Sequence, residues 1–465
     1  MRARIGMAFG AYWGGIVYVI DVITVMSTLG AIGGLPALLN ALTKGTRFPT
    51  RWLRGLHSLR FPVAILFGFS LLALQGCAPV AIREPTSSQG EAPNAIRTLG
   101  PDQRFSTLSS QSVARRVRAQ RAEQPLNILA LSGGGADGAF GAGALVGLTR
   151  SALRPQFSVV TGVSTGALIA PYAFLGPDWD DQLVEVYTSG RAEHLLQSRG
   201  LGALFGSSVY SGSPLKALVD RYATDALIQA VAHEASTGRL LLVATTDVST
   251  GEPVIWDLGS IAMNGGAGAR ALFRDVLVAS ASVPGMFPPV VIRVQEQQAL
   301  FEEVHVDGTI TVPFFVPMGF VESTRATNGP SHGTTVYVIV DGRLSEQPAP
   351  IRLRTRSILS RSVSTGLNHM LRTTLELTAT DAELEGAQFQ FAAIPLAYPQ
   401  LSSFDFRTPT MRSLFQYGYQ CAQAGRLWTS SRSVGRDEAA RGDAGTGQPQ
   451  QCPADDEFLG RLAVR

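Results

Sequence analysis

Hydrophobic residues in the middle of the chain form short apolar runs that alternate with segments of helical periodicity. Apolar runs of about four to eight residues predict buried strands, and apolar positions that recur every three or four residues predict helices. Strands are predicted at residues 127–131, 157–160, 302–307 and 335–341, and as a pair within 239–257 that turns at 249–251. Helices are predicted through 141–145 and 167–170 and over 271–282 and 365–386. The last has its apolar residues on or near one face: Leu367, Met370, Leu371, Leu375 and Leu377. This alternation predicts an α/β fold with a largely parallel sheet.

The two ends of the chain lack this alternation. Residues 1–50 are largely apolar, and residues 22–42 are long enough to span a bilayer; a start site placed too far upstream is the alternative explanation. Residues 78–124 carry Pro, Ser, Gln and Arg without apolar periodicity and predict a linker. Residues 431–465 are rich in Gly, Asp and Gln and predict a disordered tail. One main domain is therefore expected between them, over residues 125–430.

Residues 51–77 have the organisation of an export signal. Three arginines precede an apolar run, residues 61–74, that is too short for a comfortable membrane span. The following Leu-Gln-Gly-Cys ends at Cys77 and resembles a bacterial lipoprotein processing site, with Cys77 as the lipidated residue. A plain signal anchor with a buried cysteine is the alternative. Lipidation would tether the protein to a bilayer in the cell envelope, most simply the periplasmic side of the outer membrane.

Composition narrows the classes of function. A formal net charge of +3 is too small to predict nucleic-acid binding. The three cysteines exclude a disulfide-dense scaffold, and after export Cys421 and Cys452 are expected to pair, with a buried, unpaired Cys421 as the alternative. The sequence has no helical His pair and no Cys/His cluster with the spacing of metal ligands, so neither a metal nor another cofactor is predicted.

The first candidate for chemistry is Ser164, in the stretch FSVVTGVSTGALIAPYA at residues 157–173. A strand, a tight turn and a helix are predicted there, with Gly162 and Gly166 on either side of the serine. A sharp strand-to-helix turn crowds its neighbours, so residues without Cβ are favoured at these two positions. The pattern predicts an exposed serine hydroxyl at a helix N-terminus, or alternatively an ordinary connection with Ser164 as the N-cap.

Two further stretches contain residues suited to the same chemistry. Gly133, Gly134 and Gly135 follow the strand at 127–131, and their backbone N–H groups could bind a phosphate or a transient oxyanion. A dinucleotide site would need an acidic residue at the end of the next strand, and that strand instead leads into Ser164. Asp307 ends the strand at 302–307 and precedes Gly308, which places a carboxylate at a strand end where active sites collect.

Together these motifs resemble the patatin-like phospholipase family over roughly residues 125–430. In order along the chain they are the triple glycine, the G-x-S-x-G motif around Ser164 and the Asp307-Gly308 pair. The resemblance implies a three-layer fold with helices on both faces of the sheet and a lipid acyl hydrolase without a cofactor. It also implies that Ser164 is the nucleophile, Asp307 the base and the triple glycine the oxyanion hole. Asp137 stands where the family usually has Arg or Lys, and it is expected to disfavour anionic lipids.

Two alternatives remain open from the sequence. His305 lies two residues before Asp307 on the same strand face, so a Ser-His-Asp triad could use it. A non-catalytic, membrane-tethered protein that binds lipid or a partner is the second alternative, and Asp137 is its main support. The sequence does not determine the lipid class or the oligomeric state.

Overall fold

The computed structural model describes residues 96–99, 105–108, 126–200, 206–296, 299–318, 321, 333–345, 350–396, 398–399 and 402–430. They belong to one compact unit, Arg83–Arg465. The expected export signal with Cys77, the apolar segment at 22–42, Cys452 and the tail at 431–465 all lie outside these residues. Within the described part of the chain, no helix combines the length and the apolar character needed to span a bilayer.

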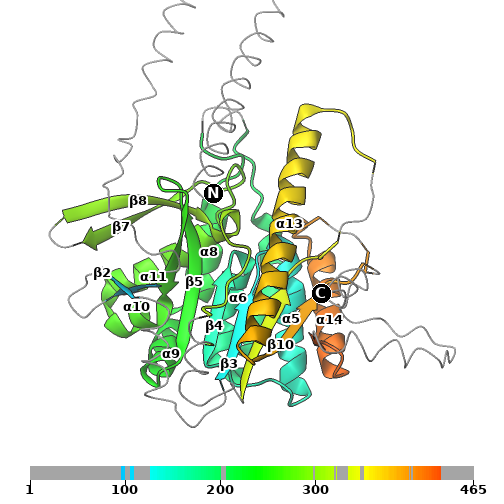
Figure 1. The fold of residues 1–465 in the computed structure, drawn as a ribbon. Coiled ribbons are helices and arrows are strands. Elements are labelled where there is room, and N and C mark those ends of the chain that lie inside the picture. The colour runs from blue at the N-terminus through cyan, green and yellow to red at the C-terminus, as the bar shows by residue number, and fades with distance from the viewer. Residues whose placement is uncertain are drawn as a thin grey trace, which may run out of the picture. The chain divides into compact units, whose positions relative to one another are not determined.

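An eleven-stranded sheet forms the centre of the described domain (Figure 1). Its order is β11-β10-β9-β3-β4-β5-β6-β1-β2, with β8 paired to β5 and β7 paired to β8. The strands are β1 Ile96–Leu99, β2 Phe105–Leu108, β3 Leu126–Leu131, β4 Val159–Val163, β5 Leu240–Asp247, β6 Glu252–Asp257, β7 Val290–Glu296, β8 Ala299–Asp307, β9 Thr334–Val340, β10 Gln388–Ala393 and β11 Thr429–Ser430. The five strands from β10 to β5 run parallel, whereas β2, β6, β7, β8 and β11 each join a neighbour antiparallel.

Helices cover both faces of the sheet, because alternate strand residues point to opposite sides. Leu129 and Leu131 of β3 enter a core beneath most of the helices, and Ile128 and Ala130 enter a second core beneath α13. The helices are α5 Gly138–Arg150, α6 Thr165–Leu175, α7 Asp180–Thr188, α8 Ser213–Tyr222, α9 Asp225–Ser236, α10 Leu258–Asn264, α11 Gly266–Ser280, α13 Thr355–Leu384 and α14 Thr408–Gln423. The predicted three-layer α/β fold with a largely parallel centre is therefore confirmed.

Two predictions made from periodicity were wrong in part. Residues 78–124 were expected to be a linker, but β1 and β2 lie within this range and join the sheet, with β1 parallel to β6. Four-residue strands at a sheet edge are too short to show clear alternation. Helix α13 begins at Thr355 rather than near 365, and Leu377 is 59% exposed, whereas Leu371 and Leu375 are buried as expected.

The structure decides between the two expectations for Cys421. Its side chain is buried in α14 and takes part in a disulfide bond, so the alternative of an unpaired thiol is wrong. The partner cysteine lies outside the described residues, and pairing with Cys452 stays a prediction.

Candidate active site

Ser164 lies at the junction of β4 and α6, as the turn motif predicts. The predicted exposure of its hydroxyl is wrong, because the residue is only 5% exposed and lines a cavity instead. Its φ of 55° is one of two positive values among the described non-glycine residues, and strained backbone of this kind concentrates at functional sites. A Cβ at position 162 would lie 2.5 Å from the carbonyl oxygen of Gly166, and one at position 166 would lie 2.4 Å from that of Leu131. Both glycines are thus required by close backbone contacts, which hold the turn tight enough to project the serine.

Asp307 is brought to Ser164 by strand pairing. It is the last residue of β8 and pairs with Thr245 of β5, next to the strand that carries Ser164. The Ser164 hydroxyl donates a hydrogen bond to Oδ2 of Asp307 at 2.5 Å, and the Thr309 backbone N–H donates to Oδ1 at 2.8 Å. Residues separated by 143 positions therefore form a direct hydroxyl–carboxylate pair.

Burial adjusts the basicity of this carboxylate. Asp307 is almost fully buried, and burial raises the pKa of its carboxyl group to about 6, although the hydrogen bonds from Ser164 and Thr309 act in the opposite direction. A carboxylate with this pKa is a better proton acceptor than an exposed one and is still mostly ionised at neutral pH.

His305 does not bridge the serine and the aspartate. Its imidazole is fully buried, with Nδ1 3.0 Å from the Thr245 hydroxyl and Nε2 3.1 Å from the Glu303 carboxylate. Both ring nitrogens are therefore engaged away from Ser164, and the alternative of a Ser-His-Asp triad is wrong. The reason is that the Asp307 side chain already reaches Ser164, while the ring of His305 turns into the core.

The triple glycine lies beside Ser164 but offers fewer donors than expected. The N–H of Gly133 donates to the carbonyl oxygen of Pro313 at 3.1 Å, so it is not free for an oxyanion. The N–H groups of Gly134 and Gly135 make no hydrogen bond to any described residue, and both residues line the same cavity as Ser164. The prediction of three free donors is corrected to two.

Asp341, which the sequence analysis missed, supports this loop. Its backbone N–H donates to the Ser132 hydroxyl at 2.9 Å, which in turn donates to the carbonyl oxygen of Gly133. Its Oδ1 accepts the N–H of Gly141 at 3.0 Å, and burial raises the pKa of its carboxyl group well above the ordinary range. The sequence did contain a signal for Asp341: it ends the strand predicted at 335–341 and is followed by a glycine, just as Asp307 ends its strand and is followed by Gly308.

A cavity of about 440 Å³ opens in front of these groups, within the usual size range for small-molecule sites. Ser164, Asp307 and the three glycines lie in its wall. Its apolar lining comes from separate parts of the chain: Val283, Ile310, Pro313, Leu367, Leu371, Ile394, Phe404 and Leu414. The space suits an ester with an apolar chain.

Asp137 also lines the cavity, but it is not a free surface charge. Its Oδ2 accepts a hydrogen bond from the Ser403 hydroxyl at 2.8 Å. Burial raises the pKa of the Asp137 carboxyl group to about 6, while Ser403 and the positive charge of Arg343 lower it. Because Arg343 lines the same cavity, the negative charge of Asp137 is partly balanced, which weakens the expected repulsion of anionic lipids.

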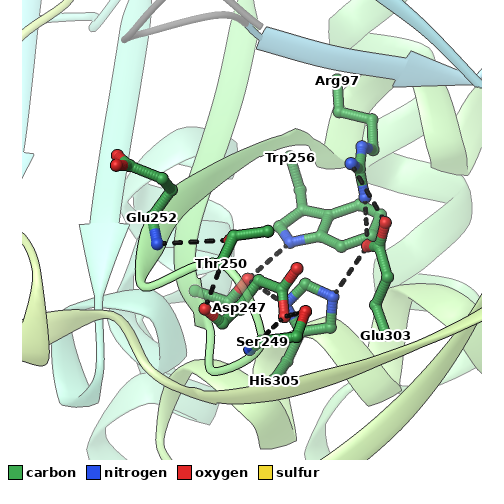
Figure 2. A network of polar contacts seen from close by, with 9 residues as sticks. Arg97, Asp247, Ser249, Thr250, Glu252, Trp256, Glu303 and His305 are labelled. Carbon is green, nitrogen blue, oxygen red and sulfur yellow. Dashed lines mark hydrogen bonds and ion pairs between the residues drawn. The ribbon is translucent and has the colours of Figure 1, made fainter. Parts of the chain in front are cut away.

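A buried polar network joins β1, β5, β6 and β8, and β8 is the strand that ends at Asp307 (Figure 2). Figure 2 shows Glu303 between the guanidinium of Arg97 and the ring of His305. Arg97 Nη1 lies 2.6 Å from the Glu303 carboxylate, and its guanidinium carbon lies 5.0 Å from the ring centre of Trp256. Burial would raise the pKa of Glu303, but the hydrogen bond from His305 and the charge of Arg97 outweigh it and lower the pKa to about 2.

Arg97→Ala should destabilise the domain by about 3–5 kcal/mol, because it leaves the Glu303 carboxylate buried without its cation. Arg293→Ala is the matched control: Arg293 pairs with Glu302 on the same hairpin, but both side chains are exposed, so the loss should stay below about 1 kcal/mol. Urea unfolding measures both. Equal losses for the two variants, or a loss below about 1 kcal/mol for Arg97→Ala, would contradict the assignment.

The described residues contain no group of three or more His, Cys, Asp or Glu side chains placed to hold a metal ion.

Comparison with known proteins finds a family model that matches the part of the chain carrying these residues. The model of the patatin-like phospholipase family matches residues 129–318, which include the triple glycine, Ser164 and Asp307. No curated protein matches the chain by sequence. Among solved structures, VipD from Legionella pneumophila aligns with 11% identity and a TM-score of 0.31 over 75% of this chain and 72% of its own. Human GIVD cytosolic phospholipase A2 aligns with 12% identity and a TM-score of 0.26 over 51% of this chain and 46% of its own.

Proposed function

We propose that this patatin-like phospholipase domain is a serine hydrolase that cleaves acyl esters of lipids through Ser164 and Asp307. One observation carries the proposal: the Ser164 hydroxyl donates directly to a buried carboxylate at 2.5 Å, in the wall of a cavity with an apolar lining. The match of residues 129–318 to the patatin-like phospholipase family supports a lipid substrate.

The reaction follows from the positions of these groups. Ser164 Oγ forms a bond to the ester carbonyl carbon while its proton passes to Asp307 Oδ2, and the carbonyl oxygen becomes an oxyanion. The N–H groups of Gly134 and Gly135 stabilise that charge. The tetrahedral intermediate collapses, the C–O bond to the alcohol breaks, and the alcohol takes the proton from Asp307. Water then attacks the carbonyl carbon of the acyl-enzyme and gives a proton to Asp307. The bond between that carbon and Ser164 Oγ breaks, Oγ takes the proton back from Asp307, and the fatty acid leaves.

We also propose that the protein works at a membrane, tethered through a lipidated Cys77 and possessing a further apolar segment at residues 22–42. The support is the pattern of arginines, apolar residues and Leu-Gln-Gly-Cys at residues 51–77. With such a tether, the domain would lie in the cell envelope, on the periplasmic side of the outer membrane.

A fluorophosphonate probe tests the proposed chemistry. We expect the folded chain to react at Ser164, identified by peptide mapping, because the probe captures serines activated by a base. The buried serines Ser132, Ser280 and Ser282 are internal controls and should stay unlabelled. A folded protein with no label and no hydrolysis of any acyl ester would contradict the proposal and favour a non-catalytic lipid-binding protein.

A further inference from the structure

Residues 351–363, at the beginning of α13, expose an unusual amount of apolar surface. Leu353 is 87% exposed, and four other large apolar side chains of this segment are 41–45% exposed: Ile351, Ile358, Leu359 and Val363. Figure 1 shows this end of α13 standing clear of the sheet. With 3.6 residues per turn, Ile358, Leu359 and Val363 lie within about 140° of the helix surface. Leu371 and Leu375, which contact the core, lie on the opposite side.

The same part of the chain is strongly cationic. Residues 351–363 contain four arginines and neither aspartate nor glutamate. Arg352 and Arg354 are exposed and flank Leu353. Apolar side chains interleaved with arginines are typical of segments that insert into the headgroup region of an anionic bilayer.

This surface adjoins the opening of the cavity. Ser360, Ser364 and Leu367 of α13 line the cavity that contains Ser164. Two other apolar residues that line the cavity, Ile310 and Phe404, are 42% and 38% exposed and so lie where the cavity meets solvent. A lipid that leaves a bilayer beneath α13 would therefore enter the cavity without crossing open water.

We propose that residues 351–363, together with Ile310 and Phe404, form a surface that docks the domain onto an anionic lipid bilayer with the cavity facing the membrane. The apolar side chains enter the lipid and the arginines contact the headgroup phosphates. The orientation rests on the proposed function, since it presents the cavity to ester lipids; the docking itself does not require hydrolysis.

The test places an environment-sensitive NBD label at Leu353→Cys in the full chain. Vesicles of phosphatidylcholine mixed with phosphatidylglycerol should raise its emission about twofold or more and shift it to the blue, and vesicles of phosphatidylcholine alone should do so more weakly. Leu384→Cys is the matched control, because Leu384 is 67% exposed at the other end of the same helix. Its label should not respond. The unaltered chain, treated in the same way, gives the background from its own cysteines.

A second variant tests the charge. In the labelled protein, Arg352→Gln with Arg354→Gln should raise the vesicle concentration needed for half of the emission change by about tenfold or more. Since the label reports only on residue 353, a tether elsewhere in the chain does not imitate this result.

Three outcomes would overturn the proposal. First, the emission of the label at residue 353 could stay unchanged in the presence of vesicles, whether or not the protein sediments with them. Both labels could respond equally. The emission at 353 could also rise with protein concentration in the absence of vesicles, which would show that a second copy covers this surface. If the label responds to vesicles as expected but the protein hydrolyses no ester, the proposed function is wrong and the proposed docking surface still stands.

Discussion

Ser164→Ala is expected to abolish ester hydrolysis, with a loss of at least about a thousandfold in kcat/KM, because the atom that attacks the carbonyl is removed. The fold should persist, since alanine is smaller than serine and the close backbone contacts of the turn are made at Gly162 and Gly166, which stay unchanged. Hydrolysis of a soluble acyl ester and thermal unfolding measure the two effects.

Ser364→Ala is the matched control for this change. Ser364 lines the same cavity, but its hydroxyl donates to the carbonyl oxygen of Arg361 within α13, so activity should change by less than about threefold. If Ser164→Ala kept as much as a tenth of the wild-type activity, Ser164 could not be the nucleophile.

Asp307→Asn is expected to lower turnover by about two to four orders of magnitude, the usual range for the loss of a general base. The asparagine keeps the shape of the side chain, and its oxygen can still accept the Thr309 N–H, but it cannot take the proton of Ser164. His305→Ala should reduce the turnover of the folded protein far less, because His305 faces Glu303 and Thr245 rather than Ser164. Turnover is therefore compared per mole of folded enzyme. Greater damage from His305→Ala would contradict a base at Asp307.

The same carboxylate determines the pH dependence. Asp307 must be ionised to accept a proton, and burial raises its pKa to about 6. The value of kcat/KM should therefore reach its maximum above neutral pH, and it should fall tenfold per pH unit as the pH drops below about 6. The residual activity of Asp307→Asn should lack this fall. The range from pH 5 to pH 7 extends about one unit on either side of the pKa of Asp307. A wild-type kcat/KM that stays constant over this range would contradict the role of Asp307 as the base.

The nucleophile turn was predictable from the sequence because its causes are local. Gly162, Ser164 and Gly166 are close in the chain, and a Cβ at position 162 would meet Gly166 and Ala167 of the same turn. The contacts that exclude a Cβ at position 166 come instead from Leu131 and Ser132, at the end of the neighbouring strand. The central strands were predictable for the same kind of reason, since strands buried on both faces are apolar throughout. In contrast, β1 and β2 belong to the sheet only because β6 provides an edge for them, and four residues carry too little pattern to indicate this.

What the sequence alone determined is the set of reacting groups: a serine in a tight turn, a glycine loop and a carboxylate at a strand end, each recognisable from its neighbours. Tertiary structure decided how these groups are used. The pairing of β8 with β5 turns Asp307 to Ser164 and His305 into the core, although both residues lie on one strand. Packing of the glycine loop against Pro313 and Asp341 occupies one of its three donors and leaves two. Such choices depend on contacts between residues far apart in the chain, where the pattern of one segment carries no information about its partner.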